Sequence, residues 1–416
     1  MSDTYVIVGG GLAGAKAAET LRAEGFDGRV VLIGDETERP YERPPLSKGY
    51  LLGNDPRDSA FVHEASWYAA NNVDLLLGVR ATDLNLHKRQ VTLDGFEPLR
   101  YDKLLLATGA RPRHLEIPGS DLGGVRYLRT LPDSDGLVYA MKDGARVVVI
   151  GAGWIGLETA AAARAHGAQA TVIEMAALPL QRVLGDEVAT IYANLHREHG
   201  VNLRMSSGIA EFVGAVGALS AVRLADGTEI PADLAIVGVG VLPNTELASA
   251  AGLHVDNGVV VDAQLRTSDP AVYACGDVAN WHNPALGTSL RVEHWANALN
   301  SGPVAAKSML GQDVTYDEVP YFYSDQYDLG MEYSGYVEPG GYDRVVFRGA
   351  TDFVDGKAPE FIAFWVKDGR VLAGMNANIW DVQDDIRKLV RAGFAGHAVD
   401  LDRLADPNVP IAELAD

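Results

Sequence analysis

The N-terminal part of the chain combines an apolar run with regularly spaced glycines. Residues 6–8 are all β-branched and predict a short buried strand. Gly9, Gly11 and Gly14 follow at the spacing Gly-x-Gly-x-x-Gly, and the alanine-rich residues 15–23 predict a helix. This order of strand, glycine-rich turn and helix is typical of a phosphate-binding turn, because the glycines allow a tight turn and let a pyrophosphate approach the backbone.

A second apolar run, residues 30–33, ends just before Asp35. An acidic side chain at this position can accept hydrogen bonds from the ribose of a bound dinucleotide. The structural alternative is a glycine-rich turn in an ordinary α/β protein. The strand, the helix and the carboxylate together favour a dinucleotide site.

The same pattern returns later in the chain. Residues 147–150 predict a strand, and Gly151, Gly153 and Gly156 repeat the spacing of the first three glycines. Residues 157–166 predict the helix that follows, and the next apolar run ends at Glu174. The two glycine series begin 142 residues apart, which is too far for one mononucleotide-binding unit. We therefore predict two separate Rossmann-like dinucleotide-binding domains.

A third glycine-containing segment follows the apolar residues 272–274. Gly276 and Asp277 come directly after this run, at a point where we expect a helix to start. Asp277 could bind the polyol chain of a cofactor or cap that helix, and the two roles are compatible.

From Tyr316 onward the pattern changes to short alternating apolar runs, which are typical of antiparallel strands. The expected strands and the helix that follows them cover residues 329–337, 344–348, 360–367, 370–375 and 381–392. The tail after Asp406 is polar and contains proline, so we expect it to be loosely ordered.

These patterns predict an α/β protein with two Rossmann-like dinucleotide-binding domains and a C-terminal α+β domain. The first domain would be discontinuous and comprise residues 1–112 and 243–317. The second would be residues 113–242, and the third would be residues 318–416.

Composition and charge narrow the range of functions. With 35 basic and 56 acidic residues the net charge is −21, which disfavours binding to nucleic acid and to anionic membranes. The single cysteine, Cys275, excludes an intrachain disulfide, and a reducing, cytoplasmic setting is expected. The ten histidines show no spacing typical of zinc ligands, so we predict no metal site.

Several further segments carry a family resemblance, the most specific being residues 43–48 and 291–298. The other matching segments are residues 6–14, 107–112, 127–130, 151–158, 256–258, 275–277 and 324–327. On these residues the chain resembles the FAD-dependent, NADH-using ferredoxin reductases of bacterial oxygenase systems. The resemblance covers nearly the whole chain and implies a glutathione-reductase-like pair of nucleotide domains.

By this resemblance the first glycine turn holds FAD and the second holds NADH. The FAD-binding residues that it implies are Gly9, Gly11, Ala13, Gly14, Asp35, Arg43, Lys48, Ala81, Thr108, Gly109, Arg129, Gly276, Asp277 and Trp295. The NADH-binding residues that it implies are Gly151, Gly153, Ile155, Gly156, Glu174, Arg182 and Gly240.

Four side chains are candidates for a catalytic role. A flavin accepts hydride at a ring nitrogen, and Lys48 near that nitrogen would favour the anionic reduced flavin. Glu158, expected in the first turn of its helix, could hold Lys48 by an ion pair. Trp295 could form an aromatic wall against the flavin, and Glu293 could contact the nicotinamide amide. The structural alternatives are a solvated lysine, a favourable charge near a helix N-terminus, a core tryptophan and a solvated strand residue.

The choice of nucleotide and acceptor follows from single residues. A carboxylate at Glu174 accepts hydrogen bonds from the ribose of NAD and repels the 2′-phosphate of NADP, and residues 175–177 contain no arginine that could offset this repulsion. Disulfide reductases of this architecture need a redox-active cysteine beside the flavin, and no cysteine lies within residues 35–48. Electrons must therefore leave the flavin for an external acceptor. We predict an iron–sulfur ferredoxin that supplies a cytochrome P450 or a ring-hydroxylating oxygenase. An NADH oxidase or peroxidase and a redox-sensing protein similar to apoptosis-inducing factor are the alternatives.

A ferredoxin would need a local basic patch on a chain this acidic, because more distant charges are screened. Arg387, Lys388 and Arg391 lie close together on the helix expected in the C-terminal domain. They could form a transient docking site on a monomer or weak homodimer. The alternative is a solvated helix face with an Asp384–Lys388 ion pair.

Overall fold

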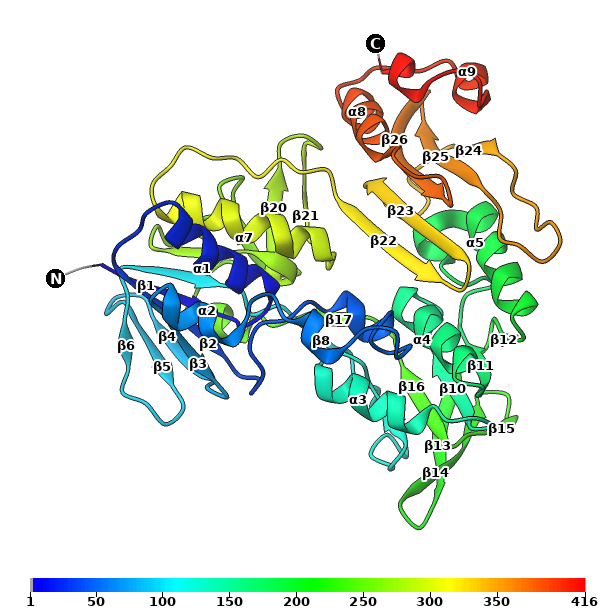
Figure 1. The fold of residues 1–416 in the computed structure, drawn as a ribbon, viewed down its shortest axis with the longest axis horizontal. Coiled ribbons are helices and arrows are strands. Elements are labelled where there is room, and N and C mark those ends of the chain that lie inside the picture. Colours follow the sequence, from blue (N-terminus) through cyan, green and yellow to red (C-terminus); the bar gives the residue numbers. More distant parts are fainter. Residues whose placement is uncertain (1–2, 416) are drawn as a thin grey trace. The chain divides into compact units, whose positions relative to one another are not determined.

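The computed structural model describes residues 3–415, and its elements are shown in Figure 1. Contacts within the chain divide it into two compact units. Unit 1 comprises the chain up to Glu42 together with Arg57–Arg111 and Leu242–Pro320, and unit 2 comprises Arg43–Pro56, Pro112–Val241 and the chain from Tyr321 onward.

Unit 1 is built on a five-stranded parallel sheet in the order β19-β7-β1-β2-β3. Val6, Val30 and Leu104 on three of its strands are completely buried, as expected for a sheet covered on both faces. The strands are β1 (Thr4–Val8), β2 (Arg29–Gly34), β3 (Val73–Leu77), β7 (Lys103–Leu106) and β19 (Val272–Ala274).

The helix α1 (Leu12–Ala23) follows β1 and packs against α7 (Trp295–Met309). The two helices approach closely where Gly302 of α7 lies against the backbone of Ala13 in α1. The remaining elements of unit 1 are η2 (Arg57–Ala60), α2 (Ala65–Ala70), α6 (Glu246–Ala250), η3 (Gly276–Val278), the antiparallel strands β4 (Ala81–Asn85), β5 (Gln90–Leu93) and β6 (Leu99–Arg100), and the strands β18 (Val259–Val261), β20 (Ala279–Asn283) and β21 (Thr288–Leu290). β8 (Ala110–Pro112) and β17 (Val241–Pro243) each span a boundary between the units along the chain.

Unit 2 contains a second five-stranded parallel sheet, in the order β12-β11-β10-β16-β9. Its strands are β9 (Val125–Arg126), β10 (Arg146–Ile150), β11 (Gln169–Ile173), β12 (Asn202–Arg204) and β16 (Leu234–Val237). It also contains η1 (Pro44–Ser47), α3 (Leu131–Ala140), α4 (Trp154–Ala165), α5 (Gln181–Glu198) and an antiparallel meander of β13 (Ile209–Ala215), β14 (Ala218–Leu224) and β15 (Glu229–Pro231). The order of strand, glycine turn and helix is therefore present twice in the protein.

The C-terminal part of unit 2 is an antiparallel sheet in the order β22-β23-β26-β25-β24, and α8 (Gln383–Phe394) packs on its strands β23 and β26. The strands are β22 (Tyr321–Gln326), β23 (Leu329–Gly335), β24 (Arg344–Gly349), β25 (Phe361–Lys367) and β26 (Arg370–Ala377). The predicted fold class, with two Rossmann-like domains and a C-terminal α+β domain, is confirmed. The residue boundaries of the three predicted domains stay a prediction.

Parts of the sequence prediction are wrong in detail. β22 was not among the expected strands, because its polar and aromatic residues hide the alternation. The tail after Asp406 is not loose: α9 (Leu401–Ala405) leads to η4 (Ile411–Leu414), in which Ile411 and Leu414 are buried. The Arg348 guanidinium also donates to the Val409 carbonyl, so apolar burial and this hydrogen bond together hold the segment.

The expected helix starts also need correction. α1 and α4 begin three residues earlier than predicted, at Leu12 and Trp154, because the middle glycine of each turn is the residue that precedes the helix. Glu158 therefore lies at the start of the second turn of α4 and not in the first. Asp277 does not start an α-helix; it lies in the single 3₁₀ turn η3, which strand β20 follows.

Two helical glycines provide a test of the packing. A Cβ on Gly302 of α7 would lie 2.4 Å from the carbonyl oxygen of Ala13, whereas a Cβ on Gly136 of α3 would meet nothing within 4 Å. We expect Gly302→Ala to destabilise the protein by about 1–3 kcal/mol, because it overpacks the α1–α7 crossing. Gly136→Ala should instead stabilise it by up to about 1 kcal/mol, because alanine favours a helix.

Thermal unfolding of the purified variants measures both effects, and the unfolding midpoints should move in opposite directions. A Gly302→Ala variant that unfolds at or above the temperature of the parent protein would contradict the close crossing of α1 and α7.

Candidate functional site

The first glycine turn has the backbone geometry of a phosphate site. The Gly9 amide donates to the Ile33 carbonyl at 2.8 Å, and Gly9 has φ +131, which favours glycine. A Cβ on Gly14 would lie 2.1 Å from the Gly9 oxygen, so only glycine allows the helix to start here. Gly11 precedes α1, and a Cβ there would meet nothing within 4 Å. This open space in front of a helix N-terminus fits a pyrophosphate.

The second glycine turn repeats this geometry. The Gly151 amide donates to the Ile173 carbonyl at 2.8 Å, and Gly151 has φ +98. A Cβ on Gly156 would lie 2.0 Å from the Gly151 oxygen, and a Cβ on Gly153 would again meet nothing within 4 Å. Each unit therefore offers one cradle that fits a dinucleotide.

The acidic residues predicted to bind ribose have different surroundings. Asp35 follows β2, is more than half exposed and pairs with Arg80 at 3.1 Å. Glu174 follows β11, and its two carboxylate oxygens accept hydrogen bonds from the amides of Ala152 and Ala176 at 2.8 and 2.9 Å. These bonds hold the Glu174 carboxylate at the second glycine turn while leaving oxygen lone pairs for further donors.

Unit 2 also contains the predicted Lys48–Glu158 pair. Lys48 follows η1, and its Nζ lies 2.8 Å from Oε1 of Glu158 on α4; the two side chains are only 14% and 2% exposed. Ser47 donates a hydrogen bond to Oε2 of Glu158, and Ser324 of β22 donates one to Oε1 at 2.7 Å. A buried carboxylate is costly unless its oxygens are paired, and here three donors from two segments surround it.

An aromatic ring completes the surroundings of the lysine. The Lys48 Nζ lies 5.2 Å from the centre of the Tyr323 ring, within the range of a cation–π contact. The ammonium is therefore fixed by a carboxylate and an aromatic face, and it is not the solvated surface lysine of the structural alternative.

The remaining catalytic candidates, Trp295 and Glu293, lie in unit 1. Trp295 is the first residue of α7, and its Nε1 donates to Oε2 of Glu42 at 3.0 Å. Glu293 lies in the irregular segment before α7 and not in a strand, and it pairs with Arg291 at 2.6 Å. Arg291 also donates to the Asp277 carbonyl at 3.2 Å, which joins this segment to η3.

The other predicted cofactor residues are divided between the units. In unit 1, Ala13 is buried in the first turn of α1, Ala81 begins β4, Thr108 donates to the Asn244 carbonyl, and Gly109 and Gly276 have φ +66 and +72. In unit 2, Arg43 donates to the Arg129 carbonyl, Ile155 is 43% exposed in α4, Gly240 has φ +93, and Arg182 lines a cavity of about 170 Å³.

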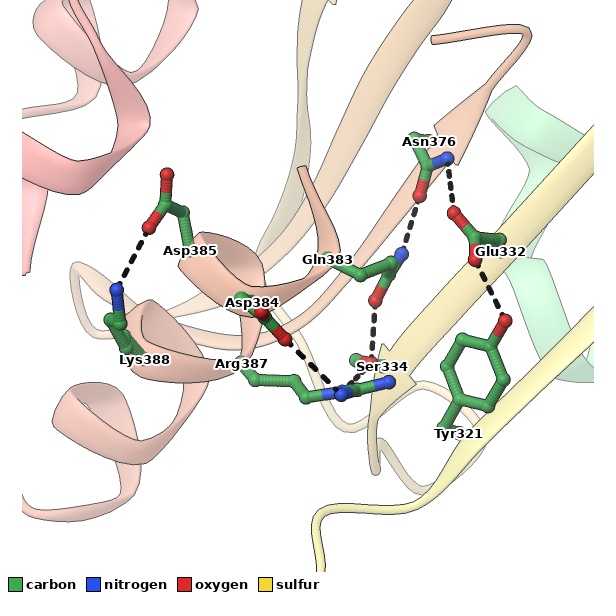
Figure 2. Close-up of polar contacts among 9 residues, drawn as sticks. All are labelled: Tyr321, Glu332, Ser334, Asn376, Gln383, Asp384, Asp385, Arg387 and Lys388. Carbon is green, nitrogen blue, oxygen red and sulfur yellow. Dashed lines mark hydrogen bonds and ion pairs between the residues drawn. The ribbon is translucent and has the colours of Figure 1, made fainter. Parts of the chain in front are cut away.

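The basic residues predicted for ferredoxin docking lie on α8, and Arg387 and Lys388 form ion pairs within the helix (Figure 2). Arg387 pairs with Asp384 at 3.4 Å and Lys388 pairs with Asp385 at 3.1 Å, so the expected Asp384–Lys388 pair is replaced by two pairs at spacing three. Lys388 remains 66% exposed.

Arg387 is also tied to the sheet below it. Its Nε donates to Ser334, and its guanidinium lies 4.9 Å from the centre of the Tyr321 ring. From Ser334 the hydrogen bonds continue through Gln383 and Asn376 to Glu332 (Figure 2). Arg387 thus helps to attach α8 to the sheet, a role that its position on the helix alone did not suggest.

Sequence reasoning missed several of these partners. Ser47 and Ser324 lie inside the segments that carry the family resemblance, so their position was a signal, but nothing indicated that both reach Glu158. The pairing of Trp295 with Glu42 spans more than 250 residues of sequence and left no local signal.

The only cysteine, Cys275, is completely buried, and burial raises the pKa of its thiol to about 12. It is therefore unreactive at neutral pH. No helix in residues 3–415 is both long and apolar enough to cross a membrane.

Comparisons with known proteins agree with this geometry. The family described as pyridine nucleotide-disulphide oxidoreductase matches residues 3–302, and the one described as reductase C-terminal matches residues 321–415. The chain is 39% identical to putidaredoxin reductase of Pseudomonas putida, over 99% of this chain and 97% of the relative. It is 42% identical to the ferredoxin–NAD(+) reductase component of the anthranilate 1,2-dioxygenase system of Burkholderia cepacia, over 98% of both chains.

Among solved structures, the covalent putidaredoxin reductase–putidaredoxin complex matches with a TM-score of 0.92 and 38% identity, over 99% of this chain and 97% of the other. The resemblance to ferredoxin reductases of bacterial oxygenase systems is confirmed. The chain belongs to the pyridine nucleotide-disulphide oxidoreductase family and carries a reductase C-terminal domain.

Proposed function

We propose that this protein is an NADH-dependent ferredoxin reductase. It would take two electrons from NADH by way of FAD and pass them singly to an iron–sulfur ferredoxin that supplies a cytochrome P450 or a ring-hydroxylating oxygenase. The observation that carries the proposal is the combination of two dinucleotide cradles with a buried Lys48–Glu158 pair in a chain without a redox-active cysteine.

The lack of a reactive thiol separates this chain from relatives that reduce disulfides. Thiol–disulfide exchange needs an accessible thiolate and usually a second cysteine. Cys275 has neither property, since it is the only cysteine and is completely buried. Electrons that enter the protein must therefore leave for an external acceptor, as the full-length similarity to ferredoxin reductases also suggests.

The first glycine turn fits FAD and the second fits NADH. FAD held there would supply a hydride acceptor that can give up two electrons singly, which suits a one-electron acceptor. The α1 and α4 N-termini would hold the pyrophosphates, and Asp35 and Glu174 would bind the adenosine riboses.

Lys48 and Glu158 would act at the flavin. Glu158 holds the Lys48 ammonium in one place, and this ammonium would stabilise negative charge on a bound flavin. Trp295, whose indole is held by a hydrogen bond to Glu42, would contact the flavin, and Glu293 would contact the nicotinamide. Both of the last two roles rest on the family resemblance.

The protein would act in the cytoplasm as a monomer or weak homodimer. The ferredoxin would dock transiently on α8, where Lys388 and Arg391 are one turn apart on the helix. Arg387 is better regarded as a structural residue because its guanidinium is bound to Ser334 and stacked near Tyr321.

The overall function is tested by NADH-driven cytochrome c reduction with a panel of purified iron–sulfur ferredoxins. We expect a yellow protein with one non-covalent FAD per chain and a rate that depends on the added ferredoxin. Rapid NADH oxidation without any acceptor would instead indicate an oxidase or peroxidase. Poor turnover with a long-lived reduced flavin would indicate a redox-sensing protein.

Glu174 should determine the choice of nucleotide. We expect kcat/KM for NADH to exceed that for NADPH at least about tenfold, because a lost ribose bond and charge repulsion cost roughly 1–3 kcal/mol. Glu174→Ala should narrow this ratio, whereas Glu198→Ala, on the exposed end of α5, should leave it unchanged. Equal kcat/KM values for both nucleotides in the parent protein would reject the assignment of Glu174.

The docking site is tested by reversing charges on α8 without touching Arg387. Replacing Lys388 and Arg391 together by Glu should raise the KM for ferredoxin at low salt and flatten its salt dependence, because complementary charges steer the encounter. A matched double variant, Arg344→Glu with Arg403→Glu, changes the net charge equally on other elements of the same domain.

Both double variants should keep full activity with NADH and ferricyanide, which needs no protein partner. If the two lose ferredoxin activity to the same extent, only net charge matters and the docking site is not on α8.

A further inference from the structure

A continuous chain of hydrogen bonds extends from Glu158 into the interior of unit 2. Ser324 lies 2.7 Å from Glu158, Gln326 lies 3.1 Å from Ser324, and His196 lies 2.8 Å from Gln326. All four side chains are at most 3% exposed. Glu158 lies on α4 and His196 on α5, whereas Ser324 and Gln326 lie on the same face of β22. A buried polar chain of this length is retained only when each of its members is satisfied.

The chemistry of the groups fixes the direction of every bond. Glu158 is the ionised partner of Lys48 and can only accept, so Ser324 must give its single proton to Glu158. Ser324 then has no proton left for Gln326, so Gln326 must donate through its amide nitrogen. The amide oxygen of Gln326 therefore faces His196, and Nε2 of His196 must carry a proton.

The far end of the chain is consistent with this direction. Burial lowers the pKa of His196 to about 4, so its imidazole is neutral and its Nδ1 is an acceptor. The hydroxyl of Tyr327 lies 3.3 Å from Nδ1 and can donate to it. The other titratable group near this ring is His199, which stacks on Tyr327 and bonds to the Leu195 carbonyl on its own helix.

We propose that His196 and Gln326 are positioning residues for the Lys48–Glu158 pair. The Nε2–H tautomer of His196 sets the orientation of the Gln326 amide, and this orientation reserves the Ser324 proton for Glu158. If the amide were reversed, Ser324 would have to donate to Gln326, and Oε1 of Glu158 would lose a donor at the oxygen that binds Lys48. The proposal rests on the proposed function, because it assigns a consequence to the position of Lys48.

The chain also ties the C-terminal domain to the second nucleotide-binding fold. Both ends of the chain lie on helices of that fold, and its middle lies on β22. A purely structural role would be to anchor the β22–β23 turn, where Tyr327 has φ +58. That role would leave the rate of flavin reduction unchanged in a variant that still folds, so the reduction rate distinguishes the two explanations.

The tautomer of the His196 imidazole can be measured without an activity assay. NMR of protein labelled with ¹⁵N-histidine, at pH 7 and with His196→Gln to assign the signal, should show His196 neutral and protonated at Nε2. A neutral His196 protonated at Nδ1 would overturn the proposal, because the Gln326 amide would then have to be reversed.

The second test measures the rate constant for flavin reduction by saturating NADH in the holoenzyme. Ser324→Ala and Gln326→Met should each slow reduction by about tenfold, with little change in the Kd for NADH, because they misplace the ion pair rather than the nucleotide. In the Ser324→Ala background, Gln326→Met should cause no further loss, since the path to Glu158 is already broken.

The control is His199→Phe, which keeps an aromatic ring stacked on Tyr327. Its flavin should be reduced by NADH at the rate of the parent protein. Losses that multiply in the double variant, or changes confined to thermal stability, would show that Gln326 acts only in folding. Failure of the parent holoenzyme to be reduced by NADH would refute the proposed function, and the NMR result would still decide the direction of the chain.

Discussion

A carboxylate enclosed by protein needs partners, and the proposed site depends on how Glu158 meets this need. Leaving a carboxylate and an ammonium out of water costs several kcal/mol per ion unless both are paired and bonded further. Here Lys48, Ser47 and Ser324 all donate to one carboxylate. The demand for these donors fixes three separate parts of the sequence, residues 43–56, α4 and β22, at a single point in unit 2.

The nucleotide cradles follow a different logic, because the backbone forms them. In both turns the last glycine lies against the carbonyl of the first, and the middle glycine leaves open space before a helix N-terminus. Side chains enter only where the two sites must differ. Glu174 is held by the amide of Ala152 in the second glycine turn and by that of Ala176, whereas Asp35 is exposed and pairs with Arg80. We therefore expect discrimination between nucleotides to be sharper at the second turn.

The sequence predicted those parts of the fold that interactions between neighbouring residues determine. The two strand–glycine–helix units could be read directly, because buried strands are continuous apolar runs and the glycines mark positions that exclude a Cβ. β22 could not, since its polar residues Ser324 and Gln326 face inward to reach Glu158 and His196. On α8, two ion pairs at spacing three replace the Asp384–Lys388 pair of the solvated-helix alternative, and Arg387 also donates to Ser334 on the sheet. Such tertiary partners leave no periodic signal in the sequence.

The central claim is that Lys48 and Glu158 act as one unit in flavin reduction. A double-mutant cycle measures this directly, with stopped-flow reduction of the holoenzyme by saturating NADH for Lys48→Met, Glu158→Gln and the double variant. The account predicts that each single change slows reduction by about tenfold, less than the roughly 10²–10⁴-fold loss of a group that transfers the proton itself. It also predicts that the double variant is no slower than Lys48→Met. Independent effects that multiply in the double variant, or single variants reduced as fast as the parent, would contradict it.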